Sequence, residues 1–145
     1  AAADAFYGIP FARLPIGELR FQKPQRASPW QGVRAATEWG PRSIQGDHPL
    51  FDHWQTIPCS EDCLYLNVFA PATKPEKALP VFFFIHGGAY SAGTAQSYGD
   101  VGICESLVSR GVVVVTAQYR VGYLGFFSTG DAACPGNFAL WDLKA

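Results

Sequence analysis

The chain has 145 residues, of which 48% are hydrophobic, 14% aromatic and 16% charged, and its formal net charge at pH 7 is −1. This length fits one domain, and the aromatic content excludes a disordered tail. Eleven Lys and Arg residues against twelve Asp and Glu residues provide no basic surface for nucleic acid. The apolar runs are a few residues long, far below the roughly 20 of a membrane-spanning helix, and no signal-peptide pattern opens the chain.

The first half of the chain predicts short strands separated by irregular segments. Prolines recur through residues 1–50 and exclude a long helix there. We expect short strand pieces at residues 6–11 and 19–21, and a long loop over residues 40–60. Alternating side chains then predict a strand over residues 64–69.

The second half predicts an α/β arrangement. Residues 81–85 are apolar without alternation, as in a parallel strand covered on both faces. Apolar spacing predicts a helix over residues 101–109, with Gly111 just past its end. Residues 112–117 predict a second buried strand, which completes a right-handed βαβ unit and leaves an unpaired edge. A further helix begins at Asn137, whose side chain can cap it.

A glycine-rich loop, His86-Gly87-Gly88-Ala89, follows the first of these strands. Ligands of open α/β sheets bind beyond the carboxyl ends of the strands, and small residues let backbone N–H groups converge on one point. Such donors stabilise an oxyanion. The other interpretation is a tight turn whose glycines supply positive φ angles, and the pattern alone leaves both open.

The four cysteines, Cys59, Cys63, Cys104 and Cys134, allow three disulfide pairings, and the sequence does not choose among them. Cys59 and Cys63 have a C-x3-C spacing, but no second pair of ligands lies near Cys104 or Cys134. His48 and His53 belong to a loop rich in Pro, Asp and Gln. We therefore expect no metal site and no cofactor.

Five blocks, in order, resemble the type-B carboxylesterase and cholinesterase family. They are FYGIPFA with GELRF at residues 6–21, SEDCLYLNV at 60–68, IHGG at 85–88, VTAQYRVGYLGF at 115–126 and PGNFALWD at 135–142. The resemblance implies an α/β fold: the N-terminal portion of an α/β-hydrolase fold, with a mixed sheet, antiparallel N-terminal strands and a βαβ unit. Residues 1–145 are then one incomplete carboxylesterase type-B domain, truncated before the nucleophile elbow.

The same resemblance implies a serine carboxylesterase that acts on small-molecule carboxylic esters without a cofactor. Gly88 and Ala89 match the oxyanion-hole donors, while the catalytic serine, acid and histidine lie beyond residue 145. The chain alone is then inactive, and secretion or residence in the ER lumen is implied. The alternatives are a non-catalytic cholinesterase-like adhesion protein, which lacks the serine, and an inactive truncated product.

Three residues around this loop carry further expectations. Ala89 stands where a third glycine is commoner, so its methyl group should narrow the acyl side of the site. Ser91, within Ala-Tyr-Ser-Ala-Gly, imitates a nucleophile elbow, but it follows the oxyanion strand, and a turn rather than a helix comes next. His86 is expected to brace the loop rather than act as a base.

By the same resemblance, Arg20 pairs with Glu61 and Arg120 with Asp142, both in structural roles. The family's cysteine that bridges to Cys63 is replaced by Ser43, so this disulfide is expected to be lost, with Cys63 either free or paired differently. A tryptophan in this loop binds choline in cholinesterases. Trp54 does not match that position, which favours a general carboxylesterase and a packing role for this ring.

Overall fold

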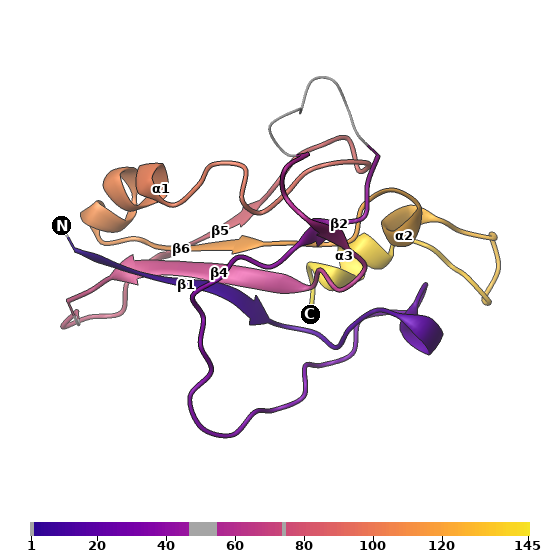
Figure 1. The fold of residues 1–145 in the computed structure, drawn as a ribbon, viewed down its shortest axis with the longest axis horizontal. Helices are drawn as coiled ribbons and strands as arrows, with labels where there is room; N and C mark the ends of the chain where they lie inside the picture. Colours follow the sequence, from indigo (N-terminus) through magenta and orange to yellow (C-terminus); the bar gives the residue numbers. More distant parts are fainter. Residues whose placement is uncertain (1, 47–54, 74) are drawn as a thin grey trace.

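The computed structural model describes residues 2–46, 55–73 and 75–145. Its centre is a four-stranded sheet in the order β1-β4-β6-β5, and β2 and β3 form a second, two-stranded sheet (Figure 1). The strands are β1 (Ala3–Pro10), β2 (Arg42–Ser43), β3 (Cys59–Ser60), β4 (Tyr65–Pro71), β5 (Val81–Ile85) and β6 (Val113–Ala117). The helical segments are η1 (Gly17–Leu19), α1 (Val101–Ser106), η3 (Val108–Arg110), α2 (Gly122–Phe126) and α3 (Phe138–Asp142).

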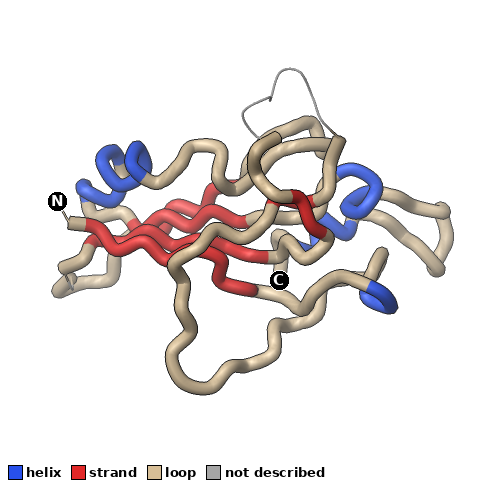
Figure 2. Tube along the Cα trace, in the orientation of Figure 1, coloured by secondary structure: helices blue, strands red, loops and turns tan. Residues whose placement is uncertain are grey.

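The sheet is mixed, as the sequence predicts. β4 pairs antiparallel with both β1 and β6, whereas β5 pairs parallel with β6 through the crossover that contains α1 and η3. In Figure 1, α1 lies at the same end of the sheet as the N-terminus, while α2 and α3 lie at the opposite end. Long loops join these elements, and a large one between η1 and β2 hangs away from the sheet (Figure 2). The α/β class and the βαβ unit are thus confirmed.

Buried polar side chains fix the register of the central strands. The pairing of β1 with β4 shifts between Phe6 and Ile9, and Gly8 has a φ of 60° within this bulge. The N–H of Gly8 donates to Asn67 Oδ1 at 3.0 Å, and Asn67 Nδ2 donates to Thr116 Oγ1 at 3.0 Å. Buried polar groups cost free energy unless they are paired, so this row specifies one register across β1, β4 and β6.

The crossover helix is held on the sheet by one long-range contact and by apolar packing. Tyr7 Oη donates to Asp100 Oδ2 at 2.5 Å, and Asp100 Oδ1 accepts from the N–H of Val101 at the start of α1. Burial, together with this hydrogen bond, raises the pKa of Tyr7 to about 12. The bond also lowers the pKa of Asp100. Beneath it, Phe69, Val108 and Val114 form a buried cluster.

Two expectations about β5 and β6 are wrong. β6 lies between β4 and β5, so residues 112–117 are not the sheet edge; β5 is. Among the described residues nothing covers both faces of β5, and Val81 is 63% exposed, with Phe83 and Ile85 about half exposed. The apolar run is typical of a strand covered on both faces, and the described residues leave the face of Val81, Phe83 and Ile85 largely open.

Local details also differ at three places. Residues 19–21 do not form a strand: Gly17–Leu19 is a single 3₁₀ turn. The helix predicted over residues 101–109 is α1 followed by η3, and Gly111 ends it with a φ of 80°, as expected. Asn137 occupies the N-cap position of α3, but its φ is 57° and its side chain caps nothing.

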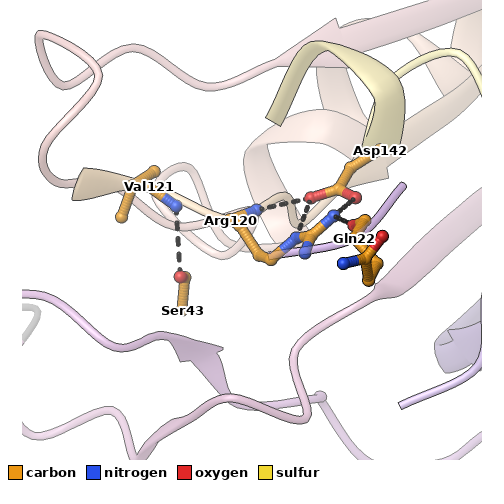
Figure 3. Close-up of polar contacts among 5 residues, drawn as sticks. All are labelled: Gln22, Ser43, Arg120, Val121 and Asp142. Atoms are coloured by element: carbon orange, nitrogen blue, oxygen red, sulfur yellow. Dashed lines mark hydrogen bonds and ion pairs between the residues drawn. The ribbon is translucent and has the colours of Figure 1, made fainter. Parts of the chain in front are cut away.

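A buried ion pair joins the end of β6 to α3 (Figure 3). Arg120 Nε and Nη2 donate to the two oxygens of Asp142 at 2.8 and 2.7 Å, and the N–H of Arg120 donates to the same carboxylate. Nη2 also donates to the carbonyl of Gln22. Nη1 is buried and has no hydrogen-bond partner among the described residues. Solvent therefore cannot replace a lost carboxylate at this guanidinium. The predicted structural pairing is confirmed.

The other predicted pair, Arg20 with Glu61, is also confirmed and lies at the surface. Arg20 Nε and Nη2 donate to the two Glu61 oxygens at 2.6 and 2.7 Å. All four cysteines, Cys63 included, are free thiols in this structure. Ser43 Oγ accepts from the N–H of Val121 at 3.2 Å (Figure 3) and hydrogen-bonds the Cys63 thiol, whose pKa burial raises to about 12.

We expect Asp142→Ala to destabilise the full-length protein by about 3–5 kcal/mol, because it leaves the Arg120 charge buried and uncompensated. Urea denaturation of the wild type and the variant measures this loss. Glu61→Gln is the matched control: it breaks an exposed pair of the same chemistry, which contributes little. Equal shifts of the denaturation midpoint in the two variants would contradict the assignment.

Candidate functional site

The loop after β5 winds around one carbonyl group. The N–H groups of Ser91 and Ala92 both donate to the carbonyl of Gly88, each at 3.0 Å. This winding places Gly88, Ala89 and Tyr90 at φ angles of 134°, 51° and 62°. Among the residues that the structure describes, no acceptor is bonded to the N–H of Gly88 or of Ala89. The N–H groups of the flanking Gly87 and Tyr90 also have no acceptor among the described residues, so the loop presents a run of free donors, with Gly88 and Ala89 at its centre, at the carboxyl end of β5.

Two glycines make this winding possible. A Cβ on Gly88 would lie 1.9 Å from the carbonyl oxygen of Ala92. A Cβ on Gly93 would lie 2.2 Å from His86 Nδ1 and 2.3 Å from the carbonyl oxygen of Gly87. Gly93 also has a φ of 125°, a region that other residues rarely enter. The backbone at the beginning of the loop is therefore in direct contact with the backbone at its end.

His86 lies beneath the loop with both ring nitrogens engaged. Nδ1 is 3.0 Å from the carbonyl oxygen of Gly87, which can only accept, so Nδ1 carries the proton. Nε2 lies 3.2 Å from Gln118 Nε2 and accepts from it. Burial lowers the pKa of His86 and favours the neutral ring. His86 thus has no nitrogen left to act as a base, in agreement with the predicted bracing role.

Gln118 and Tyr119, just after β6, complete this support. Gln118 Oε1 accepts from the N–H of Ala95 at 2.9 Å, which fixes the orientation of its carboxamide. Tyr119 stacks on the His86 ring with centroids 4.3 Å apart and donates from Oη to the carbonyl of His86 at 2.5 Å. Sequence reasoning missed both residues, because no spacing rule links residues 118 and 119 to the loop. Their only signal is their place at the end of a neighbouring parallel strand.

A hollow of about 350 Å³ opens beside the loop. Ala89 forms part of its wall, and the other lining residues are largely aromatic. Tyr90 packs edge-on against Phe126, with ring centroids 5.0 Å apart, and Tyr123 is 83% exposed. The lining residues are Ala89, Tyr90, Ser91, Gly122, Tyr123, Phe126 and Phe127. The hollow can therefore accept an apolar group next to the Ala89 amide.

The remaining candidates have no catalytic geometry in this structure. Ser91 is exposed and its Oγ lies 3.3 Å from the carbonyl of Gly88. Turns rather than a helix follow it, as predicted, and no base is bonded to it in the described part of the chain. His48, His53 and Trp54 lie outside the described residues. Across residues 2–46, 55–73 and 75–145, no cluster of side chains could hold a metal ion, and no helix could cross a membrane.

Comparison with known proteins identifies relatives over the whole chain. The model of the carboxylesterase family matches residues 1–145. The chain is 43% identical to Gut esterase 1 of Caenorhabditis briggsae over 144 residues, covering 99% of this chain and 25% of that protein. It is 44% identical to Carboxylesterase 3 of Homo sapiens over 151 residues, covering 98% and 26%.

A third relative is the medium-chain Fatty acyl-CoA hydrolase precursor of Anas platyrhynchos, 41% identical over 155 residues, which cover 99% of this chain and 27% of that protein. The chain thus spans about a quarter of the length of these curated relatives. The family match, together with the mixed sheet and its βαβ unit, identifies the fold as that of an α/β-hydrolase. The chain belongs to the carboxylesterase family.

Proposed function

We propose that the full-length protein hydrolyses carboxylic esters and that the N–H groups of Gly88 and Ala89 bind the oxyanion of the reaction. One observation carries this proposal: two consecutive backbone donors have no acceptor among the described residues, at the carboxyl end of β5. Gly88 is half-buried and Ala89 is exposed, so a ligand can reach both N–H groups. Two adjacent unpaired donors in a braced loop are typical of a site that receives negative charge from a ligand.

The chemistry that such donors serve is acyl transfer. When a serine hydroxyl attacks an ester carbonyl, the carbonyl oxygen becomes an oxyanion, and donors fixed before the reaction stabilise it without reorganisation. The nucleophile, acid and histidine of this mechanism are proposed to lie outside residues 1–145. The chain described here contributes the anion-binding part of the site, which neutral His86 supports by donating to the carbonyl of Gly87.

The substrate class follows from the same site. A small-molecule carboxylic ester places its carbonyl oxygen at the two amides and one apolar group in the hollow beside Ala89. The names of the relatives, two esterases and an acyl-CoA hydrolase, support an ester or thioester carbonyl as the reacting group. Secretion or retention in the ER lumen is proposed on family membership alone.

Gly88→Ala in the full-length protein tests the proposal most simply. We expect kcat for a chromogenic acyl ester to fall by about 100- to 1000-fold, because the new Cβ would overlap the Ala92 carbonyl and displace the donors. Gly102→Ala is the matched control: it lies in α1 with open space around its Cβ position, and it should keep wild-type activity. A folded Gly88→Ala variant with wild-type kcat would contradict the proposed role of these amides, and a wild type without activity would contradict the function.

Ala89→Gly tests the influence of the methyl group on the acyl side of the site. The change keeps the N–H and removes the methyl group of a residue that lines the hollow. It also suits the backbone, since Ala89 has a φ of 51°. We expect kcat/KM for esters with bulky acyl groups to rise relative to acetyl esters. An unchanged ratio, measured with matched acyl esters in both proteins, would show that the methyl group does not limit acyl size.

A further inference from the structure

We propose that Gln45 is a positioning residue for the oxyanion loop, an inference that rests on the proposed function. Its carboxamide makes three hydrogen bonds to backbone groups. Gln45 Oε1 accepts from the N–H of Gly93 at 2.8 Å, and Nε2 donates to the carbonyl of Gly93 at 2.9 Å. Nε2 also donates to the carbonyl of Ser43 at 3.0 Å. One side chain therefore holds both backbone groups of Gly93.

This pairing requires a glutamine. The carboxamide offers a donor and an acceptor in one plane, which matches the N–H and the carbonyl of a single residue. A glutamate at pH 7 could accept from Gly93 but would place a carboxylate oxygen against two carbonyl oxygens. A leucine would leave both groups of Gly93 without this partner. In the described part of the chain, Gln45 is the residue that bonds both of them.

Gly93 is in direct backbone contact with the peptide that carries one of the proposed donors. The peptide unit between Ala92 and Gly93 lies against the Gly88 Cα, where a Cβ would come within 1.9 Å of the Ala92 oxygen and 3.2 Å of the Gly93 nitrogen. The Gly93 Cα in turn lies against the carbonyl of Gly87. Gly87 and Gly88 share the peptide unit that carries one of the two N–H groups. A shift of Gly93 must therefore move that peptide.

Two segments hold the ends of the loop, and Gln118 also reaches the residues after it through the N–H of Ala95. Gln118 and Tyr119 hold the beginning of the loop through His86, from the end of β6. Gln45 holds its far end from the segment after β2, and β2 itself is joined to Val121 through Ser43 Oγ. Holding the reacting groups in the right geometry raises the reaction rate by large factors. A displacement of about 1 Å lowers that rate on the order of 100-fold. Loss of the Gln45 anchor should consequently affect the transition state more than substrate binding.

The test compares Gln45→Leu with the wild type in the full-length protein. We expect kcat to fall by about 10- to 100-fold while KM changes by less than about threefold. A trifluoromethyl ketone, which forms an oxyanion adduct with a serine esterase, should lose affinity by the same factor as kcat/KM. Gln25→Leu is the matched control. It removes the same type of side chain from an exposed bond with Arg13 and should leave both quantities unchanged.

Hydrogen exchange over residues 86–93 separates this inference from the proposed function. In Gln45→Leu we expect faster exchange of the Gly93 amide than in the wild type or in Gln25→Leu. A wild type that hydrolyses no ester overturns the proposed function and the role that depends on it. An active wild type whose Gln45→Leu variant keeps kcat and ketone affinity overturns the role of Gln45 alone. A fall in kcat that merely follows a loss of folded protein overturns it as well.

Discussion

The structure of this site depends on the close contact between two peptide units of one loop. The peptide of Gly87 and Gly88 and the peptide of Ala92 and Gly93 approach each other so closely that neither Gly88 nor Gly93 has room for a Cβ. This contact turns the chain around the Gly88 carbonyl, which accepts from Ser91 and Ala92. The carbonyl is thereby used within the loop, while the N–H groups of Gly88 and Ala89 stay available.

The rest of the chain holds that contact in place. The parallel pairing of β5 with β6 places the end of β6 beside the loop, so that Gln118 and Tyr119 reach His86. Arg120, the residue after Tyr119, is joined to α3 by its buried ion pair with Asp142. Burial keeps His86 neutral by lowering its pKa, which suits a ring that donates from Nδ1 and accepts at Nε2. The sheet thus acts on the site through a short series of hydrogen bonds.

Much of the fold could be predicted from local patterns. Alternation predicted β4, continuous apolar runs predicted β5 and β6, and Gly111 correctly marked the end of the crossover helix. Strand order could not be predicted. Apolar runs indicate that a strand is buried, but they do not indicate which strands are its neighbours in the sheet. For this reason the sequence predicts β6 at the edge that β5 occupies. The glycines of the loop at Gly88 do indicate it in the sequence, because their spacing reflects the close backbone contact.

The side chains that brace the loop carry no such pattern. Gln45, Gln118 and Tyr119 come from segments 48 residues before Gly93 and more than 30 residues after His86. A glutamine that pairs with a distant backbone amide looks, in sequence, like a glutamine exposed to solvent. Only the three-dimensional arrangement brings these groups together. Resemblance to a family indicates Gly88 and Ala89 as the proposed donors, whereas only the geometry shows which side chains hold their loop.

The central claim is that the Gly88 and Ala89 amides bind an oxyanion. A crystal structure of the full-length protein with a covalent trifluoromethyl ketone adduct tests it most directly. We expect the oxyanion to lie about 2.7–3.1 Å from both amide nitrogens. An adduct whose oxyanion is bound by other donors, with the two amides bonded to protein carbonyls instead, would contradict the claim.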